Sequence, residues 1–322
     1  MNSISNKIND KFWLVIVNPN AGRRKIEKDW ENIRELLLKA ELQFHTVFTE
    51  HKEHAINLTQ EFIEKGVKKF VVVGGDGTLN EVVNGIFSQK NITSDKFTVG
   101  IIPVGTGNDW CRMFNIPFKY KKAIKIIRKE RTFIQDVGKV QYHNSSDQKS
   151  RYFINVAGMG YDAVVAAKTN RDKETGRSGP LSYLKNLLTS LFFYKFSTTT
   201  ISIDENDEVI KNKTFSLSVG ICKYNGGGMM QLPKAIPNDG LLDLTLIKKI
   251  GRFAVIRNIK RLFDGTLPDH PKVITFKGKT FSIHSDPEIS LEVDGESLGH
   301  SPFKFEIIPL GLKMVIGNKE LP

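Results

Sequence analysis

The chain has 322 residues, a mass of 36.4 kDa and a hydrophobic fraction of 40%, which allows two buried cores and excludes a disordered chain. The excess of 47 Lys and Arg over 35 Asp and Glu gives a net charge of +12, so an anionic partner is expected: nucleic acid, an anionic membrane surface or an anionic substrate. The two cysteines, Cys111 and Cys222, fit neither a disulfide framework nor a zinc spacing, which predicts a reducing compartment.

The first apolar stretch, residues 12–17, is too short for a signal sequence and ends at Asn18-Pro19. We expect it to form the first strand of a protein that stays in the cytosol. No window approaches the roughly 20 apolar residues that a membrane span requires. The pattern then predicts a helix over residues 26–40, a strand over 44–48 that ends at Thr49, and a helix over 55–64.

A strand, a glycine loop and a helix follow in direct succession. Phe70-Val71-Val72-Val73 is an apolar run typical of a buried parallel strand, Gly74-Gly75-Asp76-Gly77-Thr78 indicates a sharp turn, and Leu79, Val82, Val83 and Ile86 recur at helical spacing. Glycines let a phosphate approach the N–H groups at a helix start, and Asp76 would repel that phosphate unless Mg²⁺ lay between them. The motif predicts a Mg²⁺–nucleotide site, with an ordinary strand-to-helix turn as the alternative.

Two familiar phosphate motifs fail on spacing. The dinucleotide fingerprint requires a third glycine where Asn80 stands, and the Walker A motif requires a glycine where Val273 precedes Gly278-Lys279-Thr280. We interpret the latter segment as part of a strand.

A second loop of the same kind comes after the apolar residues 97–102. Pro103-Val104-Gly105-Thr106-Gly107-Asn108-Asp109-Trp110 again combines turn residues with a helix start. The alternation of strands and helices predicts a parallel sheet with right-handed crossovers, whose ligands bind at the carboxyl ends of the strands. Both glycine loops fall at such ends.

A basic helix is predicted over residues 119–131. Its isoleucines suit packing against a core, and its lysines and arginines suit solvent, with contact to phosphates or a membrane as the alternative.

After Asp136 the sequence changes to short strands separated by turns, which predicts an antiparallel β-sandwich. The predicted strands are 139–142, 152–156, 199–203, 215–221, 241–248, 272–276 and 289–293, with hairpin tips at 144–150 and 204–212. Two helices interrupt them, one starting at Pro180 and one over residues 252–263. Both helices combine apolar residues with nearby cations, so core packing and membrane docking are both open.

Several motifs together resemble the diacylglycerol kinase catalytic domain family, and within it the soluble bacterial lipid kinases. They are Asn18-Pro19-Asn20-Ala21-Gly22, the two glycine loops, Gly158-Met159-Gly160-Tyr161-Asp162, residues 233–243 and Asp294-Gly295-Glu296. The resemblance implies an α/β fold with a Rossmann-like nucleotide-binding domain over residues 1–135, to which a tail over 308–322 returns. A β-sandwich lipid-substrate domain is implied over 136–307, with the active site in the interdomain cleft.

The resemblance also assigns residues to roles. The nucleotide ATP would be bound by Asn18, Thr49, Gly74, Gly75, Asp76, Gly77, Thr78, Asn80, Glu81, Gly105, Thr106 and Asn108. Asp76, Asp109 and Asp136 would form a carboxylate network near Mg²⁺, and Glu296 would accept the proton of the lipid hydroxyl. A structural Mg²⁺ would be held by the side chain of Asp239 and the carbonyls of Ile236 and Leu241.

Each of these assignments has a structural alternative. Thr49 could simply bond backbone at a strand end, Asp109 could be a helix N-cap, and the segments around Asp239 and Glu296 could be ordinary turns. His51 and His54 lack a third ligand and are interpreted as surface residues.

The sequence thus predicts an ATP- and Mg²⁺-dependent lipid kinase that phosphorylates a hydroxyl of diacylglycerol or a related lipid at the anionic inner membrane surface. It would be cytoplasmic and peripherally membrane-associated, with homodimerisation open. The alternatives are a phosphotransferase like NAD kinase and a non-catalytic nucleotide sensor that binds membranes. Nucleic acid is not expected as a partner, because no zinc-finger, RNP or KH signature accompanies the charge.

Overall fold

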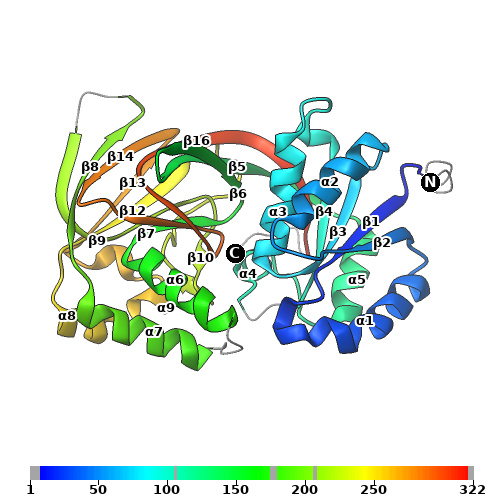
Figure 1. The fold of residues 1–322 in the computed structure, drawn as a ribbon, viewed down its shortest axis with the longest axis horizontal. Helices are drawn as coiled ribbons and strands as arrows, with labels where there is room; N and C mark the ends of the chain where they lie inside the picture. The colour runs from blue at the N-terminus through cyan, green and yellow to red at the C-terminus, as the bar shows by residue number, and fades with distance from the viewer. Residues whose placement is uncertain (1–7, 105–106, 175–179, 206–208, 318–322) are drawn as a thin grey trace. The chain divides into compact units, whose positions relative to one another are not determined.

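The structure is a computed structural model that describes residues 8–104, 107–174, 180–205 and 209–317. Contacts between residues divide the chain into two compact units (Figure 1). Unit 1 consists of Met1–Gln135 and Leu310–Pro322, and unit 2 of Asp136–Pro309. Within the described residues, no helix is both long and apolar enough to cross a lipid bilayer.

Unit 1 is built on a parallel sheet. Strand β1 (Phe12–Val17) lies between β2 (Gln43–Phe48) and β3 (Lys69–Gly74), and β3 pairs with β4 (Thr98–Pro103). All residues of β1 and β4 are buried, as expected for strands covered on both faces. The end of the long strand β16 (Glu296–Val315) continues this sheet, because Lys313 pairs in parallel with Thr98.

Helices cover both faces of the sheet. α1 (Ala21–Lys39) and α5 (Tyr120–Lys129) pack on one face, where Ile33 and Leu37 join a core with Ile124 and Ile127. On the other side, α2 (His54–Glu64) packs closely against α3 (Asp76–Ser88) (Figure 1). The short helix α4 (Asp109–Met113) follows β4.

Unit 2 is an antiparallel β-structure in which six strands pair in a closed ring. β7 (Val156–Gly160) pairs with β9 and β15, β8 with β9 and β14, and β16 with β14 and β15. The ring closes because β9 and β16 are long enough to pair with different partners at their two ends. The other ring strands are β8 (Ser197–Ile203), β9 (Val209–Gly220), β14 (Thr280–Asp286) and β15 (Ser290–Val293).

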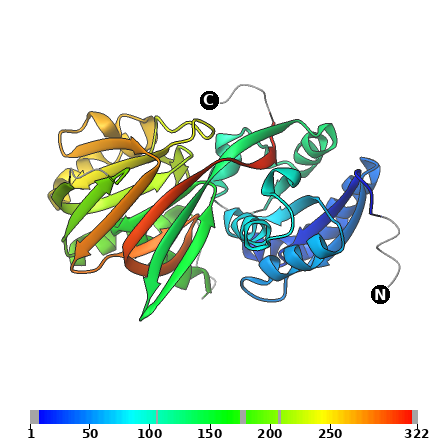
Figure 2. The ribbon, with the colours of Figure 1, turned by 90° about the horizontal axis from the view of Figure 1, so that it is seen from above.

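Further strands extend this ring. β12 (Leu242–Lys248) and β13 (Val273–Gly278) continue from β9, and β5 (Thr132–Asn144) forms a hairpin with β6 (Asp147–Phe153), green in Figure 2. A separate small hairpin joins β10 (Tyr224–Asn225) to β11 (Met229–Met230). The helices of unit 2 are α6 (Tyr161–Glu174), α7 (Pro180–Phe193), α8 (Arg252–Asn258) and α9 (Arg261–Asp264).

Three predicted elements differ from the structure. The segment Gly278-Lys279-Thr280 is not part of one strand: Gly278 ends β13, Thr280 begins β14 and Lys279 lies between them, so β14 was missed. The predicted helix over residues 252–263 is divided into α8 and α9. Helix α6 was not predicted, because Asp162, Lys168 and Asn170 obscure a continuous apolar stripe.

Candidate functional site

The ends of three parallel strands of unit 1 are joined by hydrogen bonds. Asn18, directly after β1, donates from its backbone to Val73 O (3.0 Å) and from Nδ2 to Thr78 Oγ1 (2.9 Å). The backbone N–H of Val104 donates to Gly74 O (2.8 Å). The Asn-Pro loop and the two predicted glycine loops therefore start from one edge of the sheet, where a parallel sheet binds ligands.

Two glycines make this close arrangement possible. A Cβ on Gly74 would lie 2.8 Å from Thr78 Oγ1. A Cβ on Gly22 would lie 2.3 Å from the carbonyl oxygen of Val104, and Gly22 also has a left-handed φ of 63°. A side chain fits at neither position: Gly22 lets the first loop approach the backbone at Val104, and Gly74 leaves room for the side chain of Thr78.

Asp76 joins the first glycine loop to the helix after the second. Its Oδ2 accepts the backbone N–H of Asp109 (2.9 Å), and its Oδ1 accepts that of Trp110 (3.4 Å). Asn108, just before, has a left-handed φ of 49° that turns the chain into α4. Asp76 is only partly buried, so the same carboxylate also faces solvent.

The second carboxylate of this site belongs to Asp109. A Cβ placed on the intervening Gly107 would lie 3.8 Å from Asp76 Oδ2 and 4.0 Å from Asp109 Oδ2, so the two carboxylates flank this glycine. Asp109 is also 3.6 Å from the guanidinium of Arg112. Burial raises the pKa of the nearby Cys111 thiol well above its usual range, and the negative charges of Asp76 and Asp109 raise it further.

This pair of carboxylates fits Mg²⁺ that is shared with a nucleotide. The described residues contain no group of three or more His, Cys, Asp or Glu side chains that could hold a metal. Mg²⁺ is commonly held by one or two carboxylates, with phosphate and water oxygens completing its coordination. The donor set therefore suits a metal that arrives with a polyphosphate.

Two of the predicted nucleotide-binding residues, Asn80 and Glu81, form hydrogen bonds within the protein. Both carboxylate oxygens of Glu81 accept backbone N–H groups, those of Glu53 (2.9 Å) and Ala55 (3.1 Å), so Glu81 caps the start of α2. Asn80 is fully buried, and its Oδ1 accepts a hydrogen bond from Asn84 (3.0 Å). The structure thus gives both side chains a structural role, and their predicted contact with the nucleotide stays a prediction.

Three more residues were predicted to bind the nucleotide: one of them is described by the structure and two are not. The backbone N–H of the buried Thr49 donates to Val17 O (2.9 Å), which places it beside the end of β1. Gly105 and Thr106 lie outside the described residues.

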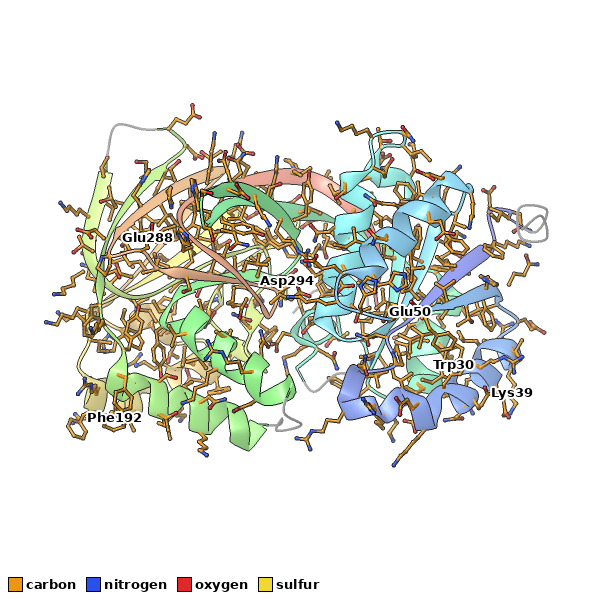
Figure 3. The ribbon with its side chains drawn as sticks, viewed as in Figure 1. Trp30, Lys39, Glu50, Phe192, Glu288 and Asp294 are labelled. Atoms are coloured by element: carbon orange, nitrogen blue, oxygen red, sulfur yellow. The ribbon has the colours of Figure 1, made fainter. Side chains whose placement is uncertain are left out.

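In unit 2, the turn Asp294-Gly295-Glu296 joins β15 to β16, and Figure 3 labels Asp294. The Asp294 carboxylate accepts the backbone N–H groups of Ile154, Asn155 and Val156 at 3.0–3.1 Å. Asp294 therefore fixes the turn against the start of β7.

Glu296, the predicted proton acceptor, forms an ion pair with Arg151. Glu296 Oε2 lies 3.0 Å from Arg151 Nη2, and the two side chains are only 13% and 7% exposed. An arginine in this position stabilises the charged carboxylate and fixes its direction.

The sequence matches two family models. The diacylglycerol kinase catalytic domain matches residues 12–140, and the YegS C-terminal NAD kinase beta sandwich-like domain matches residues 155–316. A diacylglycerol kinase of Staphylococcus saprophyticus is 30% identical over 292 residues, which cover 90% of each chain. The chain belongs to the diacylglycerol kinase family.

Solved structures agree with this membership in the family. A crystal structure of a diacylglycerol kinase from Bacillus anthracis has a TM-score of 0.72 and 26% identity, covering 95% of this chain and 97% of that one. Yeast NADH kinase complexed with NADH has a TM-score of 0.51 at 13% identity, covering 96% and 84% of the two chains, which is a likeness of fold alone. The predicted combination of an α/β domain and a β-rich domain is confirmed.

At the turn for which the family resemblance predicts a structural Mg²⁺, the structure places a lysine beside two carboxylates. Asp239 Oδ1 accepts the backbone N–H of Leu241 (3.1 Å), and its Oδ2 accepts Lys277 Nζ (2.9 Å). The same ammonium lies 3.2 Å from Asp243. The ammonium of Lys277 therefore compensates the charge of these carboxylates, and the predicted Mg²⁺ ligands Ile236, Asp239 and Leu241 stay a prediction.

Asp136 has a local role in unit 2. Its Oδ2 accepts the backbone N–H of Gly240 (2.8 Å), and its own N–H donates to Pro237 O (2.8 Å). Asp136 thus anchors the turn that contains Asp239, and its predicted place in a network with Asp76 and Asp109 stays a prediction.

Sequence reasoning missed a buried polar cluster behind the Asp-Gly-Glu turn. Glu292 is 2% exposed; its Oε2 accepts the backbone N–H of Gly295 (2.9 Å) and its Oε1 accepts Asn225 Nδ2 (2.7 Å). Burial raises the pKa of Glu292 to about 8 and that of nearby Asp162 to about 6. The available signal was an acidic residue in the middle of an otherwise apolar strand.

Proposed function

We propose that the protein is an ATP- and Mg²⁺-dependent lipid kinase that transfers the γ-phosphoryl group to a hydroxyl of diacylglycerol or a related membrane lipid. The observation that carries this proposal is the hydrogen bond from Asp109 N–H to Asp76, which joins two glycine loops and two carboxylates at one sheet edge. Relatives at 30% identity that are named diacylglycerol kinase support the choice of a lipid acceptor.

Unit 1 has the chemistry to bind the triphosphate. Loops without side chains let phosphate oxygens approach backbone N–H groups, and Asp76 and Asp109 would hold the metal. When bound, Mg²⁺ would neutralise charge on the β- and γ-phosphates. The Asn18–Thr78 hydrogen bond would keep the first two loops together around the nucleotide.

Unit 2 has the chemistry to accept the proton. We assign this role to Glu296: as the lipid oxygen forms its bond to the γ-phosphorus, the bond to the β–γ bridging oxygen breaks and Glu296 takes the hydroxyl proton. The products would be ADP and a lipid phosphomonoester. A carboxylate suffices because a loose transition state releases the proton late. Arg151 would be a positioning residue that keeps Glu296 charged.

A phosphate-transfer screen tests the proposal. Purified protein would receive ATP, Mg²⁺ and mixed micelles that each contain one candidate lipid: diacylglycerol, ceramide, a sphingoid base or phosphatidylglycerol. We expect transfer to at least one lipid and none to soluble NAD. Transfer to NAD alone would favour the NAD kinase-like alternative, for which the fold likeness to yeast NADH kinase is the supporting observation. Binding of ATP without transfer to any acceptor would favour the non-catalytic alternative.

We further propose that the protein acts from the cytoplasm at the inner face of the membrane. A lipid acceptor resides in a bilayer, and the net charge of +12 favours anionic lipid surfaces.

A further inference from the structure

The most exposed large apolar side chains of the described residues lie on the helices of unit 2. Phe193 of α7 is 87% exposed and Phe253 of α8 is 83% exposed. Phe192 of α7, Ile256 of α8 and Phe263 of α9 are 41–51% exposed, and Figure 3 shows Phe192 at the outer side of α7. These five side chains are called the aromatic patch below.

The aromatic patch is not the face by which these helices pack. Leu187 and Leu191 of α7 are buried in a core with Tyr161 and Phe215. Val255, Ile259 and Leu262 pack against the same core from α8 and α9. The inner faces of the helices form this core, and the exposed phenylalanines of the patch are not part of it.

Helices α7 and α8 contribute to one continuous surface. The guanidinium carbon of Arg252 lies 5.9 Å from the centre of the Phe192 ring, and Lys249 Nζ lies 5.7 Å from the ring of Phe196, just after α7. Contacts of cations with aromatic faces hold the two segments together.

Lysines and arginines predominate at the margin of the patch, although the exposed Asp264 directly follows Phe263. Residues 248–263 contain six Lys and Arg and no Asp or Glu, and residues 185–196 add two Lys and no acid. Lys249, Arg252, Arg257 and Lys260 are exposed. Within the described residues none of these four forms an ion pair with a carboxylate. Their charge is therefore available to an external anionic surface.

We propose that the aromatic patch and its cations dock unit 2 on an anionic lipid bilayer. Aromatic side chains partition into the headgroup region, and nearby lysines and arginines are attracted to anionic lipids. A second copy of the chain would bring six further cations against these, which disfavours a homodimer through this surface. This inference rests on the proposed function in one respect: a lipid kinase must extract its acceptor from a bilayer.

Vesicle co-sedimentation tests the docking without requiring turnover. Wild-type protein is expected to bind phosphatidylcholine vesicles that contain phosphatidylglycerol, and to bind pure phosphatidylcholine more weakly. Two variants remove the two halves of the surface: Phe193→Ser with Phe253→Ser, and Arg252→Gln with Arg257→Gln and Lys260→Gln. Each should weaken binding to anionic vesicles by at least about tenfold. The first variant loses apolar area that would be buried in the headgroup region, and the second loses cations that each contribute about fivefold.

Matched controls change the same chemistry elsewhere. Leu38→Ser removes a half-exposed apolar side chain from α1, and Lys52→Gln with Lys149→Gln and Lys211→Gln removes three exposed cations. Both controls should bind vesicles within about twofold of wild type. Thermal unfolding of every variant separates loss of docking from loss of folding.

Activity assays distinguish failure of docking from failure of the proposed function. With short-chain monomeric diacylglycerol the patch variants should keep wild-type turnover, whereas with vesicles their turnover should fall with binding. Wild-type binding by both folded patch variants would overturn the docking proposal and leave the kinase proposal intact. A dimer that light scattering shows to dissociate in the patch variants would instead assign the surface to self-association. Vesicle binding through the patch without transfer to any lipid would overturn the kinase proposal alone.

Discussion

The carboxylate of Asp76 accepts the backbone N–H of Asp109 at 2.9 Å, so the aspartate of one glycine loop fixes the helix that follows the other. From the sequence, Asp76 could be interpreted only as a metal ligand or as a turn residue. The structure shows that two of its properties can be tested separately. One is its negative charge, and the other is its capacity to accept a hydrogen bond.

Asp76→Asn separates these properties, because the amide oxygen still accepts a hydrogen bond but carries no charge. We expect turnover to fall by at least about a hundredfold, with little change in the melting temperature. Asp76→Ala should lose turnover to the same extent and also lower the melting temperature, because the start of α4 loses its acceptor. Equal melting temperatures for both variants would show that the hydrogen bond from Asp109 N–H to Asp76 does not stabilise the start of α4.

Glu296→Gln should reduce turnover by about a hundredfold or more, because the amide cannot accept the hydroxyl proton. The measurement is kcat with saturating ATP and lipid. Glu288→Gln is the matched control, because this carboxylate is close in sequence, 65% exposed and paired with His300. Near wild-type kcat in Glu296→Gln would remove the role assigned to this residue.

Gly22→Ala should raise the KM for ATP and destabilise unit 1 by about 1–2 kcal/mol, since the left-handed φ and the Val104 carbonyl both oppose a side chain. Gly251→Ala is the control, because a Cβ at that position meets no atom within 4 Å and its φ is −72°. Isothermal titration with an ATP analogue and urea unfolding measure the two effects. Equal behaviour of the two variants would show that the first loop adjusts freely.

Glu292 should make stability depend on pH. Burial raises its pKa in the folded state to about 8, above the ordinary value of 4.5, so the folded state binds the extra proton between these values. The free energy of unfolding should therefore fall as pH rises through this window, by up to about 1.4 kcal/mol per pH unit. Urea unfolding at pH 5 and pH 8 should show a smaller loss in Glu292→Gln. Burial also raises the pKa of the neighbouring Asp162 to about 6, so some pH dependence should remain in Glu292→Gln. An unchanged slope in Glu292→Gln would contradict the assignment.

Lys277→Met tests whether lysine replaces a metal at the turn near Asp239. Without nucleotide, Mg²⁺ should not change the melting temperature of the wild type, because Lys277 already pairs with Asp239 and Asp243. Lys277→Met leaves two neighbouring carboxylates and should gain Mg²⁺-dependent stability, measured by thermal unfolding, whereas Lys279→Met should not. A Mg²⁺ effect in the wild type that Asp239→Ala abolishes would restore the metal turn.

Strands β1, β3 and β4 of unit 1 were predictable because each is a largely apolar run that leads into a glycine or Asn-Pro turn. β14 was not, because Gly278 and Thr280 border a one-residue turn whose direction depends on the pairing of Thr280 with Glu306. The two loops at the carboxyl ends of β3 and β4 were predictable from their glycines. The partners of Glu81 and Asp239 were not visible, because Ala55 and Lys277 come close only in the folded chain.

Strand β16 has a consequence for how the protein is made. Its residue Lys313 completes the sheet of unit 1 beside Thr98, although the rest of that sheet is encoded before residue 104. During synthesis the edge of β4 therefore stays open while all of unit 2 leaves the ribosome. Unit 1 is therefore the first to be synthesised and the last to be completed. A fragment that ends before residue 310 would lack one strand of the unit 1 sheet.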